Sequence, residues 1–340
     1  MDIDRQQIAR YDKETVSNSG LAALSVSPRV YRNYKDRVEQ ATASYFNLGS
    51  AIHCEVLEPD EFDDRYLVSN IVAPGGMYAT FIDTLFRTRS KDGKEFTGLQ
   101  KETWIVNAHG EAGFKWPAKK VWEKFESDPD LSGYYQALIN TKDKILLSGK
   151  DKKAIEGCMA GTQSHTKAAE LLYGYVLSDC RNELEVVWKH PKHPWFKMKS
   201  IFDRVIIDET TKTAILVDLK TTSKPVSSFK YSYQKYDYHR QMALYKMGLK
   251  WYLENNFTCM DGSKPNIDDW NFEVYIVATQ TNGYGDTAVY TPCEEDLVLG
   301  LEQADKLLTR MAWHFDNDEW DQPMEYYTND GVLTLSLNED

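Results

Sequence analysis

Two short runs of mostly β-branched and apolar residues, joined by a polar stretch, constrain the fold of this chain most strongly. Residues 198–207 and 213–220 each have the length and composition of a β-strand, and turn-forming residues lie between them. The pattern predicts an antiparallel hairpin. A symmetric turn centred on residues 210–211 places Asp203 directly opposite Asp218.

Directly opposed residues of a hairpin point to the same face, with their Cβ atoms about 4.5–5.5 Å apart. Lys220 follows Asp218 by two residues and therefore shares that face. Opposed carboxylates repel unless a cation lies between them, and carboxylate ligands suit the hard ions Mg²⁺ and Mn²⁺. The hairpin therefore predicts a metal site for phosphodiester hydrolysis. The alternative is a solvated hairpin with two surface acids and an unrelated lysine.

Composition narrows the class of protein. The chain has 340 residues and is 42% hydrophobic, which is ample for a large core. It contains no apolar run of about 18 residues and its N-terminus does not resemble a signal peptide, so we expect a cytoplasmic protein without a membrane span. Its five cysteines are scattered, which indicates neither a zinc site nor a disulfide framework.

Charge is distributed unevenly along the chain. The net charge is −12, yet residues 188–250 contain thirteen Lys or Arg and five Asp or Glu, a balance of +8. No Lys or Arg follows Arg310, whereas eight acids do. A basic zone around the acid pair can hold phosphates, and acidic outer surfaces repel unproductive contacts. Lys199 and Lys224 lie in this zone and are candidate DNA-binding residues. The alternative is charge patterning for solubility alone.

The remaining pattern predicts helices and strands in an order typical of a mixed α/β, or α+β, domain with a helical N-terminal part and a central sheet flanked by helices. A polar segment at about 86–150 is expected to be an insertion, and residues 296–340 a C-terminal helix with an acidic tail. Helices are expected at residues 11–40 with a break at 25–28, and at 46–58, 151–175, 234–254 and 294–314; strands are expected at 183–189, 272–279 and 286–291, besides the acid hairpin.

The order of motifs resembles the PD-(D/E)XK nuclease superfamily, and most closely the branch that holds the RecB nuclease domain and the phage-type RecE exonucleases. The resemblance covers about residues 11–295. Its pieces are, in order, Ser17-x-Ser19-Gly20-Leu21 with Ser27-Pro28, Leu48-Gly49-x-Ala51-x-His53 with residues 57–62, Glu183-x-x-x-x-Trp188, Asp203 with Asp218-x-Lys220, and Tyr238-His239-x-Gln241-x-x-x-Tyr245.

The resemblance implies a single nuclease domain over residues 1–295, with roles for particular residues. His53, Asp203 and Asp218 would hold the metal, Lys220 would position the attacking water, and Glu183 would assist. Glu185 is the fallback for Glu183, because both lie on the same strand face. Gln241, Tyr245 and Tyr238 would brace the site or contact DNA. No cysteine set for an iron–sulfur cluster and no Walker motif is present.

The function expected from these features is a Mg²⁺-dependent exonuclease, with Mn²⁺ as a substitute metal, that digests linear double-stranded DNA from its ends for recombination. The resemblance implies a homo-oligomer in a bacterial or phage-infected cytoplasm, with a single-strand annealing recombinase as the candidate partner. Two alternatives stay open. One is an endonuclease or a nuclease subunit of a larger complex, and the other is a non-catalytic protein that binds or mimics DNA.

Overall fold

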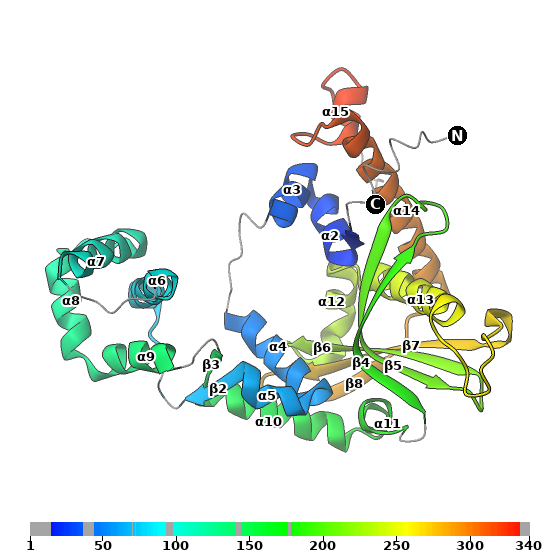
Figure 1. The fold of residues 1–340 in the computed structure, drawn as a ribbon, viewed down its shortest axis with the longest axis horizontal. Coiled ribbons are helices and arrows are strands. Elements are labelled where there is room, and N and C mark those ends of the chain that lie inside the picture. The colour runs from blue at the N-terminus through cyan, green and yellow to red at the C-terminus, as the bar shows by residue number, and fades with distance from the viewer. Residues whose placement is uncertain are drawn as a thin grey trace. The chain divides into compact units, whose positions relative to one another are not determined.

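A computed structural model describes residues 15–36, 44–69, 71, 73–92, 98–140, 144–175 and 178–333 (Figure 1). The chain forms two compact units, and the boundary between them falls within one helix. The first unit comprises residues 1–43 and 158–340, and the second comprises residues 44–157. Within the described residues, no helix combines the length and the apolar character needed to cross a membrane.

The first unit is built on a six-stranded mixed sheet. Antiparallel ladders join β4 to β5, β5 to β6 and β7 to β8, whereas β1 runs parallel to β5 and β6 parallel to β7. The strands are β1 (Thr15–Ser17), β4 (Asp179–Lys189), β5 (Lys197–Asp208), β6 (Thr213–Thr222), β7 (Asn271–Gln280) and β8 (Thr287–Tyr290). The predicted α/β class is therefore confirmed, as are the acid hairpin and the strand that precedes it.

Helices flank this sheet. One core combines strand residues with apolar side chains of α2, α3, α13 and α14. On β5, Arg204 instead donates to the carbonyl of Leu171 at the end of α11. The helices of this unit are α2 (Asn18–Val26), α3 (Pro28–Asp36), α11 (Thr166–Tyr173), α12 (Phe229–Lys235), α13 (Tyr238–Asn255), α14 (Glu294–Asn317) and α15 (Met324–Thr328), with η1 (Val226–Ser228) and η2 (Ile267–Asp269); α10 (Gly149–Ser164) crosses the unit boundary.

Close packing of α13 on the sheet positions the residues that this helix contributes to the site. A Cβ atom at Gly248 would lie 2.8 Å from the indole nitrogen of Trp188, so only glycine allows this approach. The same indole donates to Ser200 Oγ at 3.0 Å, and the ring of Tyr245 meets Phe202 edge-on at 5.2 Å. Residues one and two turns before Gly248 are therefore held over β5 and β6.

Three sequence-based boundaries were wrong. Residues 15–17 were expected to be helical but form β1, because a parallel partner on β5 stabilises an extended conformation there. The helix predicted over residues 151–175 is divided at His165, which caps α11. The helix predicted from residue 234 begins at Tyr238, because Asp237 takes a left-handed backbone conformation after α12. The predicted break before Pro28 is confirmed, with Ser27 capping α3.

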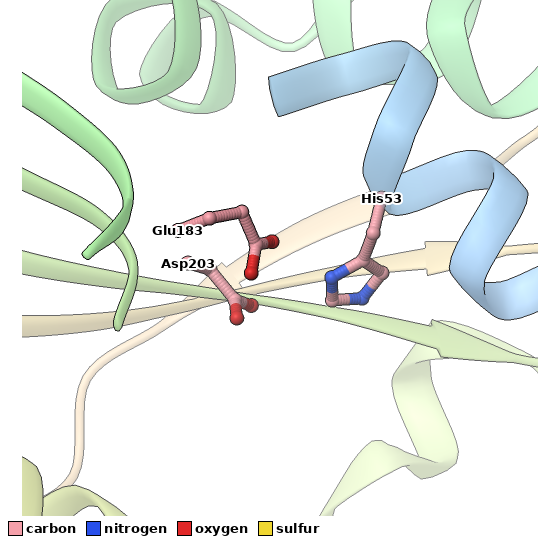
Figure 2. A group of neighbouring side chains, drawn as sticks. All are labelled: His53, Glu183 and Asp203. Carbon is pink, nitrogen blue, oxygen red and sulfur yellow. The ribbon is translucent and has the colours of Figure 1, made fainter. Parts of the chain in front are cut away.

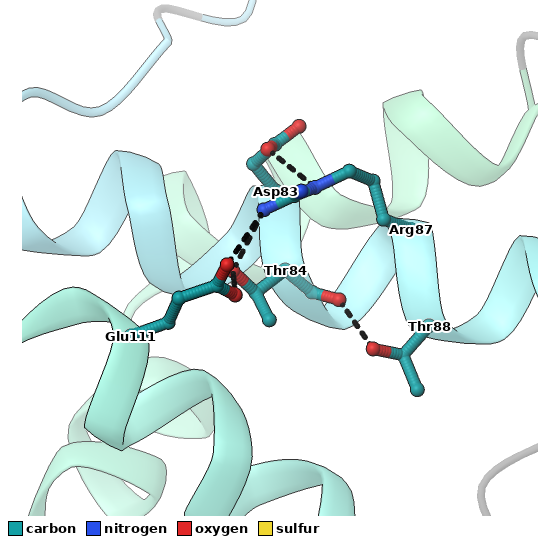
Figure 3. A network of polar contacts seen from close by, with 5 residues as sticks. All are labelled: Asp83, Thr84, Arg87, Thr88 and Glu111. Atoms are coloured by element: carbon teal, nitrogen blue, oxygen red, sulfur yellow. Dashed lines mark hydrogen bonds and ion pairs between the residues drawn. The ribbon is translucent and has the colours of Figure 1, made fainter. Parts of the chain in front are cut away.

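The second unit contains a helical bundle beside a small parallel sheet. Its aromatic core is formed by α6 to α9. Polar contacts tie α6 to α7: Thr84 Oγ1 donates to Glu111 at 2.6 Å, and Arg87 bridges Asp83 and Glu111 (Figure 3). The elements are α4 (Ser44–Leu57), α5 (Pro59–Arg65), β2 (Tyr66–Ser69), α6 (Gly76–Asp92), α7 (Gly98–Ala112), α8 (Ala118–Ser127), α9 (Pro129–Asn140) and β3 (Ile145–Ser148).

The turn between β4 and β5 contains two buried histidines. His193 Nε2 lies 2.7 Å from Asp305 Oδ1 on α14, and the rings of His190 and His193 are 5.2 Å apart. Burial, with the neighbouring His193, lowers the pKa of His190 to about 4. His190 is therefore neutral in the folded protein at pH values where an unfolded histidine would already be protonated.

We expect acid to destabilise the protein through His190. The pKa of His190 is lower in the folded protein than in the unfolded chain, so stability is lost as the pH falls from about 6.5 towards 4. The loss is up to about 3 kcal/mol, because each pKa unit corresponds to about 1.36 kcal/mol. The measurement is the urea unfolding midpoint of wild type and His190→Gln between pH 7 and pH 4. The variant should lose less stability than wild type over this range. An equal loss in both proteins would contradict the assignment.

Candidate metal centre

The register of the acid hairpin is the one predicted. Five residue pairs join β5 to β6, from Asp208 opposite Thr213 to Arg204 opposite Val217. The next residues in this register are Asp203 and Asp218, one step beyond the last pair. The backbone ladder stops there, and the amide of Leu219 donates instead to Asp203 Oδ2 at 2.7 Å. The Asp203 side chain thus takes the place of a strand partner where β6 leaves β5.

Two different strands share this edge of β5. β1 pairs with residues 197–199, and β6 pairs with residues 204–208. Asp203 lies in the interval between the two, where the edge of β5 is not covered by either ladder. A carboxylate at such a position can reach a ligand that approaches between two diverging strands. The sheet topology therefore places Asp203 at the gap between the β1 and β6 ladders.

Glu183 lies on the other side of Asp203. The β4–β5 ladder pairs Asn182 with Arg204 and Leu184 with Phe202, so its register sets Glu183 opposite Asp203. An oxygen of each carboxylate lies within 4.8 Å of the other, and the two side chains converge in Figure 2. Glu183, Asp203 and Asp218 therefore occupy matching positions on three neighbouring strands.

The backbone is irregular at this position. Glu183 has a φ of 49°, in the left-handed region that a glutamate rarely adopts. On β5, Phe202 and Val205 belong to the same core although they are three residues apart, so the alternation of side chains also changes beside Asp203. The left-handed conformation of Glu183 costs about 1–3 kcal/mol. Such strain persists where other contacts enforce it, often at functional sites. Here it directs a second carboxylate towards Asp203.

Lys220 neutralises part of this negative charge. Its Nζ lies 2.6 Å from Asp218 Oδ2, and Gln241 Nε2 of α13 donates to Asp218 Oδ1 at 3.2 Å. Asp218 is fully buried. Burial alone would lower the pKa of Lys220, but the carboxylates of Asp218 and Asp203 outweigh it and raise that pKa above its usual range. Lys220 is therefore a fixed cation at neutral pH, not a general base.

Two tyrosines of α13 enclose the lysine and the acids. Lys220 Nζ lies 5.1 Å from the ring centroid of Tyr238, within cation–π range. Burial, with the negative charge of Asp218, raises the pKa of Tyr245 to about 12. Tyr245 is therefore a protonated hydroxyl that can donate a hydrogen bond at neutral pH. The structure thus brings together Asp203, Asp218, Lys220, Gln241, Tyr238 and Tyr245, and the roles that the family resemblance implies for them stay predictions.

The donor set fits a hard divalent cation. Burial raises the pKa of Asp203 above its ordinary value, against the opposing effects of Lys220 and the Leu219 amide. A divalent cation between these carboxylates would favour their ionised forms. Oxygens that share one Mg²⁺ lie about 3–4 Å apart, since each bond is about 2.1 Å. The Glu183 and Asp203 oxygens lie within 4.8 Å of each other, which is compatible with this spacing.

The other predicted residues occupy distinct places. His53 is half-buried on α4, in the second unit, and is drawn with the two carboxylates in Figure 2; its role as a ligand stays a prediction. Glu185 is exposed and forms an ion pair with Lys199 at 2.6 Å, so it is already engaged outside the acid group. Lys224 is exposed in the loop after β6.

A cavity that the sequence did not predict adjoins the site. It has a volume of about 710 Å³, and Gln241, Tyr245 and Lys199 form part of its wall. The opposite wall comes from β1 and the start of α2, together with Lys35 of α3. Long-range pairing of β1 with β5 creates this wall, and no local pattern encodes such pairing. The sequence analysis had noted residues of this wall only as the serine motif at residues 17–19, which is part of the family resemblance.

The chain matches no profile of a known protein family and no curated protein. Among solved structures, it is similar to the crystal structure of a protein named "Putative exonuclease" from Eubacterium rectale, at 11% sequence identity and a TM-score of 0.46. That similarity covers 99% of this chain and 97% of the other.

Proposed function

We propose that this chain is a divalent-metal-dependent nuclease that hydrolyses phosphodiester bonds of DNA. One observation carries the proposal: half-buried Lys220 lies 2.6 Å from the buried Asp218 on β6, next to the position of Asp203 on β5, whose carboxylate lies within 4.8 Å of that of Glu183. Phosphodiester hydrolysis needs a site for a metal ion and a fixed positive charge near the developing charge of the phosphate. This acid–lysine group offers both.

Each residue has a distinct role in this proposal. Glu183, Asp203 and Asp218 would hold the ion, and His53 is a further ligand on the basis of the family resemblance. A bound Mg²⁺ would lower the pKa of a coordinated water and polarise the phosphoryl oxygen. Lys220, which stays protonated, donates hydrogen bonds to the attacking water or to a phosphate oxygen. Gln241 fixes the Asp218 carboxylate through its 3.2 Å hydrogen bond.

The finer proposal concerns the substrate. We propose that linear double-stranded DNA is digested from its ends, as the resemblance to RecE-type exonucleases implies. The basic segment at residues 188–250, which includes Lys199 and Lys224, supports a polyanionic substrate because it holds eight more cationic than anionic residues. A homo-oligomer that encloses DNA and a partnership with an annealing recombinase are proposed on the resemblance alone.

Cleavage of matched linear and circular duplex DNA tests the function. The full-length protein is incubated with each substrate in Mg²⁺, in Mn²⁺ and in EDTA, and products are resolved on denaturing gels. We expect loss of the linear duplex with either metal, with circles intact and no reaction in EDTA. The short products and their labelled ends also give the strand polarity.

Each of the other outcomes indicates a different function. Cutting of closed circles would identify an endonuclease and refute digestion from ends. Metal-independent cutting would refute the role of the acid group. DNA binding without cleavage under any condition would favour the non-catalytic alternative.

A further inference from the structure

A lysine- and tyrosine-rich surface lies on α12, and its C-terminal end adjoins the candidate metal centre. α12 and the residue that ends it form this surface, which we call the α12 platform and define as Lys230, Tyr231, Lys235 and Tyr236. The side chains of Tyr231 and Tyr236 are 64% and 52% exposed. Lys230 Nζ lies 5.1 Å from the ring centroid of Tyr231, and Lys235 Nζ lies 5.0 Å from that of Tyr236.

Tyr236 connects the C-terminal end of the platform to the acid–lysine group. The ring of Tyr236 lies 5.7 Å from that of Tyr238, with a tilt of 36° between them. Tyr238 in turn lies under Lys220, whose ammonium contacts Asp218. All of these residues belong to the first unit. An aromatic path therefore leads from the solvent to the residues proposed to act on the phosphodiester.

The composition of the platform fits one kind of ligand. Among the described residues, neither Lys230 nor Lys235 has a carboxylate within ion-pair distance, so both ammonium groups are available to an anion. Exposed aromatic rings add little to the core but can stack on bases, and lysines can contact the phosphates between those bases. Bases in the interior of a duplex already cover each other's faces. The platform therefore fits a strand with unpaired bases.

We propose that the α12 platform binds unpaired bases of a nucleic-acid strand next to the metal centre. This inference rests on the proposed nuclease function for its biological sense, but the binding itself needs no catalysis. Tyr231 and Tyr236 each stack on a base, while Lys230 and Lys235 contact the adjoining phosphates. Both lysine side chains are long and exposed, so each can move off the tyrosine ring that it covers. A base can then stack on that ring.

Binding in EDTA separates this inference from the proposed cleavage. Fluorescence anisotropy is measured for the full-length protein with a single-stranded oligonucleotide, the blunt duplex of the same sequence, and a duplex with a single-stranded overhang. Tyr236→Ala and Tyr231→Ala should each weaken binding to the single strand and the overhang about five- to a hundredfold, with less effect on the blunt duplex. Tyr236→Phe should bind almost as wild type, because the ring is retained.

A matched control comes from another exposed tyrosine. Tyr284, in the turn between β7 and β8, is 92% exposed and lies outside the platform, so Tyr284→Ala should bind as wild type. The double variant Lys230→Gln/Lys235→Gln should reduce the slope of log affinity against log salt by about 1.4, at about 0.7 for each single-strand phosphate contact. Parallel titrations with DNA and RNA strands show which sugar the platform accepts.

The outcomes distinguish the two proposals. Unchanged single-strand binding in both alanine variants would overturn the platform even if the wild-type protein cleaves DNA. Platform-dependent binding by a protein that never cleaves would support the platform and refute the nuclease function. A change of oligomeric state on Tyr231→Ala, with nucleic-acid binding unaltered, would identify the platform as a protein interface and overturn the inference.

Discussion

Asp203→Asn is expected to reduce metal-dependent cleavage by at least about a thousandfold without destabilising the metal-free protein. If Asp203 holds the ion as proposed, the rate falls because a charged ligand is lost beside Glu183. Stability is retained because an asparagine oxygen can still accept from the Leu219 amide, and because desolvation disfavours the charged form of Asp203 in the metal-free protein. The measurements are cleavage rate, Mg²⁺ binding by calorimetry, and thermal unfolding in EDTA.

Asp208→Asn is the matched control for this change. Asp208 ends the same strand, and its carboxylate accepts from the amides of Thr210 and Thr211, away from the acid–lysine group. It should cleave and bind Mg²⁺ as wild type does. If Asp203→Asn bound Mg²⁺ with unchanged affinity, Asp203 would not be a ligand. A cleavage rate within tenfold of wild type would contradict its catalytic role.

Lys220→Met should both inactivate and destabilise the protein. Removal of one partner from a buried ion pair costs about 3–5 kcal/mol, because the other charge is left uncompensated; here Asp218 loses its ammonium. Cleavage should fall by about a hundredfold or more, since a fixed donor near the phosphate is lost. Added Mg²⁺ should raise the melting temperature of this variant more than that of wild type, because the ion supplies the missing charge.

Two further variants sharpen this test. The double variant Asp218→Leu/Lys220→Met removes both charges, so it should recover most of the lost stability but none of the activity. Lys246→Met breaks a more exposed ion pair with Glu294 and should cost less than about 1 kcal/mol. A double variant no more stable than Lys220→Met would show that the pair is not energetically coupled.

Local patterns were sufficient to predict the hairpin and its register. The polar stretch after residue 207 fixes the turn, and apolar strands on either side allow only one register that buries them. From that register alone, Asp203 and Asp218 could be set opposite each other. The position of Lys220 on the same face followed from the two-residue period of a strand.

Features that depend on distant parts of the chain were not predictable in this way. Residues 15–17 are too short a run to indicate a strand by themselves, and they are extended because β5 pairs with them across about 180 residues of sequence. The left-handed backbone of Glu183 has no local signal, since glutamate rarely adopts it. Likewise, the cavity wall opposite Gln241 exists only after β1 has docked.

The conformation of Glu183 affects which substitutions can be accepted at this position during evolution. A chain selected for stability alone would carry glycine or asparagine at a position with a φ of 49°. Drift towards those residues would relax the strand and remove a carboxylate in one step. If Glu183 holds the metal as proposed, selection for chemistry opposes selection for stability at this position.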